Sequence, residues 1–86
     1  MTYTIRLTSG ARKCINSLPS KVADAVLEFA YSALAENPYR VGKPLHHKWK
    51  GYHSARRSSY RIVYQIIDET VTVQIVKVAY RAEAYR

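Results

Sequence analysis

Three arginines lie within six residues of one another in the segment SARRSSYRIVY, positions 54–64. They are Arg56, Arg57 and Arg61, and the last of them opens an apolar run typical of a buried strand. A guanidinium group is planar and permanently charged, which suits it to holding the oxygens of a phosphate group. Because like charges crowded at the start of a strand repel one another, this spacing indicates a site for a negatively charged partner.

The positive charge of the chain is concentrated around these arginines. The 86 residues carry 14 Lys and Arg against 6 Asp and Glu, a formal net charge of +8. Positions 40–61 contain no acidic residue and hold all three histidines together with Arg40, Lys43, Lys48, Lys50, Arg56, Arg57 and Arg61. A block of one sign is relieved by a polyanion or an acidic protein, and nucleic acid is the usual partner of such domains. The alternative is a solvated basic loop without a partner.

Other kinds of site find little support in the sequence. The single cysteine, Cys14, lies on the apolar stripe of a predicted helix, so we expect it in the core rather than as a nucleophile. The adjacent His46 and His47 lack the spacing of a tetrahedral zinc site. Neither a glycine-rich phosphate loop nor a close pair of carboxylates is present. We therefore expect no metal and no cofactor.

The length of the chain predicts one domain, residues 1–86. No apolar run approaches the roughly 18 residues needed to span a membrane. The first residues lack the apolar stretch of a signal peptide, and one cysteine cannot form an internal disulfide. A cytoplasmic protein with no membrane partner is the simplest expectation.

The N-terminal third predicts one strand and the first of two helices. Residues 3–7 alternate apolar and polar side chains, the pattern of a strand. The hydroxyl of Thr8 or Ser9 can then cap a short amphipathic helix that Pro19 ends.

A second helix and a long loop follow. Ser20 is predicted to cap the helix, which ends at Asn37-Pro38. Residues 38–51 contain two prolines and two glycines, so we interpret them as a loop. This loop holds the first half of the basic stretch.

The C-terminal half predicts three strands. Residues 52–57 and 60–67 are expected to pair across a turn at Ser58-Ser59. A tight turn at Asp68-Glu69 leads to the last strand, residues 70–79. The alternation of that strand slips after Ile75, which indicates a bulge or a strand covered on both faces.

These elements predict an α+β fold with the order β-α-α-β-β-β, in which a helical hairpin packs on one face of a small, mainly antiparallel sheet. Alternation places Arg61 and Val63 on one face, Ile62 and Tyr64 on the other. Since the helices cover only one face, arginines at the strand ends would line the other. The predicted register places residue 61 opposite roughly residue 76, with Arg81 slightly beyond that end on the same side.

At this point the chain resembles a known family, the RelE/ParE toxins of bacterial toxin–antitoxin pairs. The resemblance covers nearly the whole length and rests on the order of elements together with four segments: GKPL (42–45), WKGYHSARR (49–57), YRIVY (60–64) and VAYRAEAY (78–85). The GKPL and SARR segments look like the RelE branch.

The resemblance implies a ribosome-dependent mRNA endonuclease held inactive in a complex with a cognate acidic antitoxin. Arg61 and Arg81 match the phosphate-contacting arginines of the family, and Tyr85 matches a tyrosine beside the attacking 2′-hydroxyl. Arg56 matches a basic position on the preceding strand. The remaining residues expected to bind RNA come from the basic stretch: Lys43, Lys48, Lys50, His53 and Arg57.

The implied chemistry requires no metal, because RNA carries its own nucleophile, the 2′-hydroxyl. The general base and acid stay open, since Tyr52 and Ser54 stand where some members carry lysines, and Tyr80 where many carry histidine. Two other functions also stay open: a ParE-like poison of DNA gyrase and a non-catalytic RNA-binding module.

Overall fold

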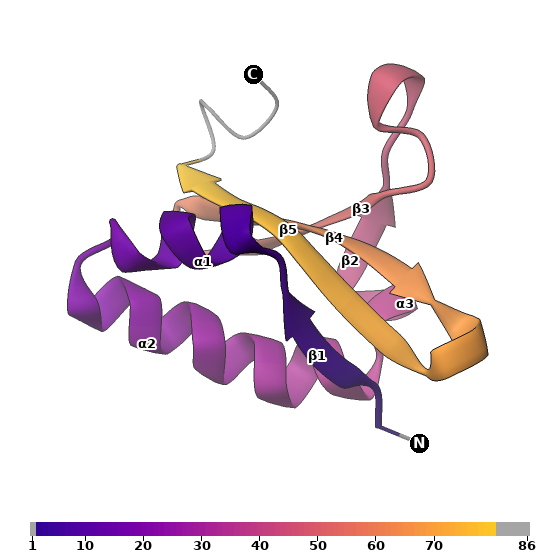
Figure 1. Ribbon diagram of the computed structural model, residues 1–86, viewed down its shortest axis with the longest axis horizontal. Helices are drawn as coiled ribbons and strands as arrows, with labels where there is room; N and C mark the ends of the chain where they lie inside the picture. Colours follow the sequence, from indigo (N-terminus) through magenta and orange to yellow (C-terminus); the bar gives the residue numbers. More distant parts are fainter. Residues whose placement is uncertain (1, 81–86) are drawn as a thin grey trace.

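The computed structural model describes residues 2–80 and consists of one five-stranded sheet with two helices against one of its faces (Figure 1). The strand order is β1-β5-β4-β3-β2. The first strand, β1 (Thr4–Leu7), runs parallel to β5 (Thr72–Tyr80), and the other neighbouring pairs are antiparallel. The predicted α+β fold with a helical hairpin on one face of a mainly antiparallel sheet is confirmed.

The two helices are α1 (Ser9–Asn16) and α2 (Ser20–Phe29), and α2 continues as a π-helical turn, Ala30–Leu34. The predicted Thr8 cap is confirmed, since its hydroxyl accepts from the Ala11 amide at 3.1 Å. The predicted Ser20 cap is wrong. Pro19 holds the cap position with no side-chain hydrogen bond, because its fixed φ already sets the entry into the helix. Within residues 2–80, no helix is long and apolar enough to cross a bilayer.

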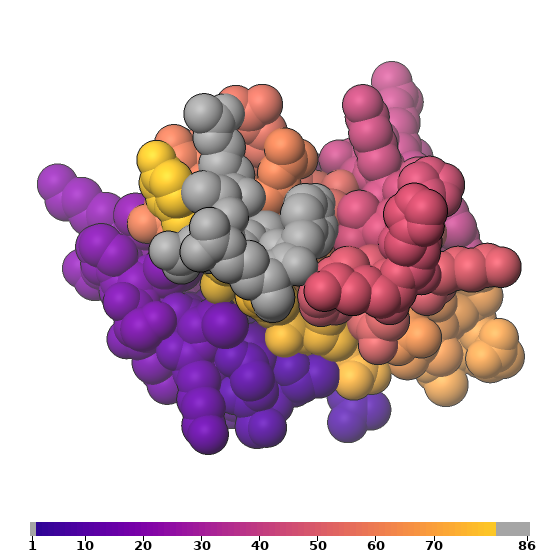
Figure 2. Space-filling view, turned by 90° about the horizontal axis from the view of Figure 1, so that it is seen from above, coloured from indigo at the N-terminus to yellow at the C-terminus, as the bar shows by residue number. Residues whose placement is uncertain are grey.

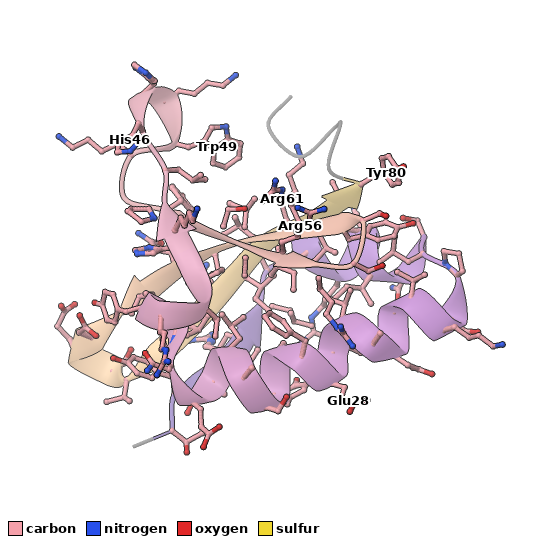
Figure 3. All side chains as sticks on the ribbon, turned by 180° about the vertical axis from the view of Figure 1, so that it is seen from behind. Glu28, His46, Trp49, Arg56, Arg61 and Tyr80 are labelled. Carbon is pink, nitrogen blue, oxygen red and sulfur yellow. The ribbon has the colours of Figure 1, made fainter. Side chains whose placement is uncertain are left out.

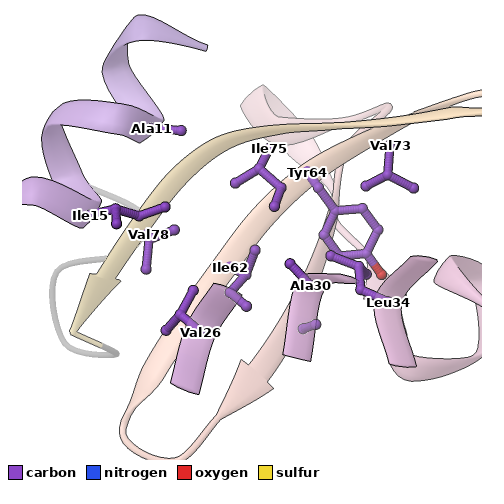
Figure 4. Packing of buried hydrophobic residues seen from close by; sticks show 11 residues of the cluster. Ala11, Ile15, Val26, Ala30, Leu34, Ile62, Tyr64, Val73, Ile75 and Val78 are labelled. Atoms are coloured by element: carbon purple, nitrogen blue, oxygen red, sulfur yellow. The ribbon is translucent and has the colours of Figure 1, made fainter. Parts of the chain in front are cut away.

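The core lies between this helical hairpin and the sheet (Figure 4). Ile62 and Tyr64 point into it, as the alternation predicts, and both are fully buried. Cys14 packs against its edge, half-buried. The other buried members are Ala11, Ile15, Val26, Ala30, Leu34, Ala55, Val73, Ile75 and Val78. The opposite face of the sheet is therefore available to the arginines.

The segment predicted as a loop contains a helix and a fifth strand, so that prediction is wrong. It forms α3 (Pro38–Val41), β2 (Gly42–Pro44) and a 3₁₀ turn (His47–Trp49), and β2 pairs with β3 (His53–Arg57). The sequence did not predict β2 because Gly42 and Pro44 are residue types that are uncommon in strands. Pro44 is tolerated on an edge strand, and a Cβ on Gly42 would collide with the hydroxyl of Tyr64.

Residues 45–52, between β2 and β3, extend away from the sheet, and we call them the projecting loop (Figure 1). A backbone hydrogen bond of 2.9 Å from the Leu45 amide to the Tyr52 carbonyl closes its base. Within the loop the Trp49 and Tyr52 rings meet edge to face, with centroids 5.6 Å apart. The loop is thus braced at its base and by its own aromatic side chains.

The last two strands, β4 (Tyr60–Ile67) and β5, pair in a register that differs from the predicted one. Arg61 lies opposite Ala79 rather than residue 76. The turn is a 3₁₀ turn over Asp68–Thr70 followed by Val71 in the left-handed conformation, so β5 begins later than predicted. In addition, Val63 pairs with Lys77 and Tyr64 with Ile75, which leaves Val76 as the extra residue of a bulge. Of the two explanations of the slip after Ile75, the bulge is confirmed.

The β4–β5 turn is tied to the rest of the fold by a carboxylate. Asp68 accepts hydrogen bonds from the Tyr3 hydroxyl, at 2.9 Å, and from the Tyr39 hydroxyl. These bonds lower the pKa of Asp68 and raise the pKa of Tyr39 to about 12. The cluster joins the N-terminal segment, α3 and the turn at the end of the sheet away from the arginines.

Candidate nucleic-acid interface

Arg56 on β3 and Arg61 on β4 are direct cross-strand partners. Each alternates with core residues along its strand, so both lie on the face without helices, as Figure 3 shows. With Lys43 of β2 they line a hollow of about 450 Å³, here called the basic hollow. Its other lining residues are Val41, Gly42, Pro44, Leu45 and Ser54. Cations from three adjacent strands thus converge on one concave, partly apolar surface.

Buried residues next to these cations hold the strands in place. Ser54 is 6% exposed and Val63 is fully buried, although Val63 faces away from the helical core. On the other side of Arg61 its cross-strand partner is Ala79 of β5. Charged groups beside such a partly dried surface interact with an anion more strongly than groups surrounded by water.

Lys77 also faces this side of the sheet, and the sequence analysis missed it. Its cross-strand partner is Val63, which lies two residues from Arg61 on the same face of β4. Its Nζ lies 6.0 Å from the centroid of the Trp49 ring, which comes from the projecting loop. The bulge at Val76 turns Lys77 toward the open face. In the sequence, the slip of alternation after Ile75 was the only sign of this change of direction.

Lys48 and Lys50 are exposed on the projecting loop. They do not line the basic hollow, but their loop stands beside it. Figure 2 looks onto the open side, with the loop (magenta to red) on one side and the β3–β4 end (salmon) on the other. Figure 3 shows His46 and Trp49 on the same side of the sheet as Arg56 and Arg61. A long anionic strand could touch both regions.

Two predicted RNA-binding residues, His53 and Arg57, point toward the face of the sheet that the helices cover. The His53 ring stacks on Tyr64, with centroids 5.7 Å apart, and burial lowers its pKa. Its Nδ1 is buried without a hydrogen-bond partner among the described residues. Arg57 lines a separate hollow of about 160 Å³ beside α2. The structure therefore does not bring either side chain to the basic hollow.

Arg81 and Tyr85 lie outside the described residues. The last described residue, Tyr80, pairs with Tyr60, and their rings meet edge to face at 5.7 Å. Because Ala79 is the partner of Arg61, β5 brings the chain beside the basic hollow just before position 81.

Comparison with known proteins identifies relatives over the whole chain. A family profile described as "ParE toxin of type II toxin-antitoxin system, parDE" matches residues 5–85. The chain is 48% identical to toxin RelG of Mycobacterium tuberculosis over 86 residues, covering 100% of this chain and 99% of RelG. It is 43% identical to toxin RelE of the same organism over 84 residues, covering 98% and 87%.

Solved structures agree with this relationship. The fold matches a chain of the toxin–antitoxin complex RelBE2 from M. tuberculosis with a TM-score of 0.91 and 46% identity, covering 96% of this chain and 95% of that one. It matches isolated Escherichia coli RelE with a TM-score of 0.73 and 28% identity, covering 98% and 86%. The chain therefore belongs to the RelE/ParE family of toxins of type II toxin–antitoxin systems.

Proposed function

We propose that this RelE-family toxin is a ribosome-dependent mRNA endonuclease. The observation that carries the proposal is the cross-strand pair Arg56–Arg61, which with Lys43 lines a hollow on the open face of the sheet. Such a set of cations suits the phosphate backbone of RNA. The similarity to the toxins named RelE and RelG supports the same function.

In the proposed reaction the substrate supplies the nucleophile. The 2′-hydroxyl oxygen attacks the adjacent phosphorus, and the bond from phosphorus to the 5′ oxygen breaks. The products are a 2′,3′-cyclic phosphate and a 5′-hydroxyl, so one proton leaves the 2′ oxygen and one reaches the 5′ oxygen. The arginines would stabilise the charge that develops on the phosphoryl oxygens, a contribution typically of about 10²–10³ in rate for one donor.

Arg81 and Tyr85 complete the proposed site. The arginine would add a further phosphate contact, and the tyrosine hydroxyl would handle or orient the 2′ proton. Tyrosine is a weak base near neutral pH, with an ordinary pKa of about 10. A site with weak proton-transfer groups depends on precise placement of its substrate, which is the contribution we assign to the ribosome.

We also propose a cognate antitoxin as the partner that keeps the toxin inactive. The M. tuberculosis homologue was crystallised as a toxin–antitoxin complex. Positions 40–61 carry no acidic residue in a chain of net charge +8, so an acidic antitoxin segment fits this surface.

The test is primer extension on messages in a reconstituted translation system. Added toxin should cut translated mRNA within the reading frame, and the cleavage should disappear without ribosomes. The family profile is described as a ParE toxin, which makes gyrase poisoning the second candidate. Intact messages together with damaged DNA in arrested cells would reject the endonuclease in favour of that alternative.

A further inference from the structure

We propose that Lys77, which lies beside the basic hollow on the same face of the sheet, is a substrate-contacting cation held in position by the indole ring of Trp49. In this role its ammonium group binds the phosphoryl oxygens of the RNA at the cleavage site. The inference rests on the endonuclease function proposed above and assigns a further residue to it.

The first observation is the register of the sheet. Arg56, Arg61 and Ala79 form one cross-strand row, and Ser54, Val63 and Lys77 form the next row. Residues two apart on a strand face the same side, and such rows are separated by about 6–7 Å. An extended lysine side chain spans about that distance. Lys77 is a diagonal neighbour of Arg61 across β4 and β5, at a separation of about 7–8 Å that long side chains bridge, so one phosphate group can contact both.

The second observation is the contact with Trp49. The Lys77 Nζ lies 6.0 Å from the centroid of the indole ring, within the range of a cation–π interaction. The ring is itself braced edge-on by Tyr52, with an angle of 86° between the planes. Such a contact restricts an otherwise flexible side chain, so less entropy is lost when the ammonium group binds a ligand.

The third observation is the charge of the surroundings. Among the described residues that line the basic hollow there is no carboxylate. The described acids lie instead on α2, just after the π-helical turn, and in the β4–β5 turn. Lys43, Arg56 and Arg61 thus concentrate positive charge in the hollow beside Lys77, and a phosphodiester relieves the repulsion among these three side chains.

The experiment measures single-turnover cleavage of mRNA on saturating ribosomes. Lys77→Met keeps the aliphatic stem and removes the charge, and its rate constant should fall by about 10²–10³-fold. Lys77→Arg keeps the charge and should stay within about tenfold of wild type. Lys21→Met, an exposed lysine in the first turn of α2, controls for loss of one cation and should be unchanged.

A double-mutant cycle tests the role of the indole. Trp49→Leu should lower the rate about 3–10-fold when Lys77 is present and have no further effect in the Lys77→Met background. Trp49→Phe, which keeps a ring, should lie between Trp49→Leu and wild type. Circular dichroism and antitoxin binding verify that each variant is folded, and Lys77→Gln replaces Lys77→Met if that variant is not.

Wild-type cleavage by folded Lys77→Met or Lys77→Gln would overturn the inference while leaving the proposed function intact. An equal loss in Lys21→Met would also overturn it, because the effect would then belong to overall charge. Additive effects of the Trp49 and Lys77 changes would remove the positioning role of Trp49. Absence of cleavage by the wild-type toxin would instead reject the proposed function, and this inference with it.

Discussion

Arg56 and Arg61 stand directly opposite each other on β3 and β4, so one cross-strand pair holds two like charges. Like charges in this position destabilise a sheet. Hydrogen bonding within residues 2–80 offsets little of the cost, since the Arg56 Nε donates to the Ser58 carbonyl oxygen over a long 3.4 Å. The pair therefore costs the fold stability, which supports the phosphate-binding role that we propose for it.

Replacing Arg56 should separate stability from activity. Arg56→Thr removes the repulsion and adds a good strand former, so the free energy of unfolding should rise by about 0.2–1 kcal/mol. Cleavage of translated mRNA should fall by about 10²–10³-fold. Urea denaturation and primer extension measure the two effects. Arg57→Thr is the stability control, because its cross-strand partner is Tyr60 and no repulsion is relieved. A destabilised Arg56→Thr would contradict this account of the pair.

Tyr85→Phe distinguishes the endonuclease from a gyrase poison. The change keeps the ring and removes the hydroxyl that we assign to the 2′ proton. Cleavage in a reconstituted translation system should fall by about 10²–10⁴-fold, with ribosome binding unchanged. Wild-type cleavage in this variant would exclude Tyr85 as the proton-handling group. Toxicity that persists with intact messages and damaged DNA would indicate gyrase as the target.

Gly42→Ala should destabilise the β2 wall of the basic hollow. The added Cβ would collide with the Tyr64 hydroxyl and lie 2.9 Å from the Ser54 carbonyl oxygen, and overpacking of this kind typically costs about 1–3 kcal/mol. Thermal unfolding of single and double variants measures the effect. The stability lost on Gly42→Ala should be smaller when Tyr64 has already been replaced by Phe. The comparison is between Tyr64→Phe and the double variant Gly42→Ala/Tyr64→Phe.

The matched control for this prediction is Gly10→Ala in α1. Its nearest neighbour, the Val76 carbonyl oxygen, lies at an ordinary 3.7 Å from the added Cβ. Because alanine is the better helix former, this variant should gain about 0.5–1 kcal/mol. Equal destabilisation of both alanine variants would show that the Tyr64 contact is not the cause.

Asp68 should make stability depend on acid pH. Hydrogen bonds from Tyr39 and Tyr3 hold its pKa below the ordinary 3.8, so the folded state binds this proton less readily than the unfolded state. Its contribution is complete above pH 4 and is lost as the pH falls through the lower, folded pKa. Wild type should therefore exceed Asp68→Asn in stability at pH 7, and the difference should shrink below pH 4.

Urea unfolding across this pH range measures that difference. Asp24→Asn, at an exposed position on α2, removes the same charge without the two tyrosine bonds. A gap between wild type and Asp68→Asn that stays constant down to pH 2 would argue against the hydrogen-bonded cluster as its source.

The rate of association with the antitoxin should fall markedly as salt is added. The basic stretch and the acidic partner proposed for it would attract each other at a distance, and added ions screen such steering. Stopped-flow mixing at several ionic strengths measures the slope. A rate that does not change with salt would rule out an electrostatic encounter over residues 40–61.

Most of the local elements, and the direction in which strand residues point, could be predicted from the order of amino acids. Thr8 as a cap and the inward direction of Ile62 and Tyr64 were predictable, because caps and periodicity depend on the backbone geometry of neighbouring residues. The outward direction of Arg61 followed from the same alternation. The slip of alternation after Ile75 was also visible, and a bulge was one of its two possible explanations.

Which of these elements lie next to one another depends on contacts between residues far apart in the chain. The strand β2 is three residues long. It carries a glycine at position 42 because the hydroxyl of Tyr64, a residue distant in the chain, occupies the place of a Cβ. The pairing of Arg61 with Ala79 depends on the left-handed Val71 and on the bulge. Local propensity does not predict how many residues either feature adds to the turn or the strand, so it cannot predict the register. Lys77 and Trp49 meet because the projecting loop stands beside β5. Register and edge pairing are set by non-local packing, and for that reason the order of residues alone could not show that Lys43 of β2 joins Arg56 and Arg61 in one hollow.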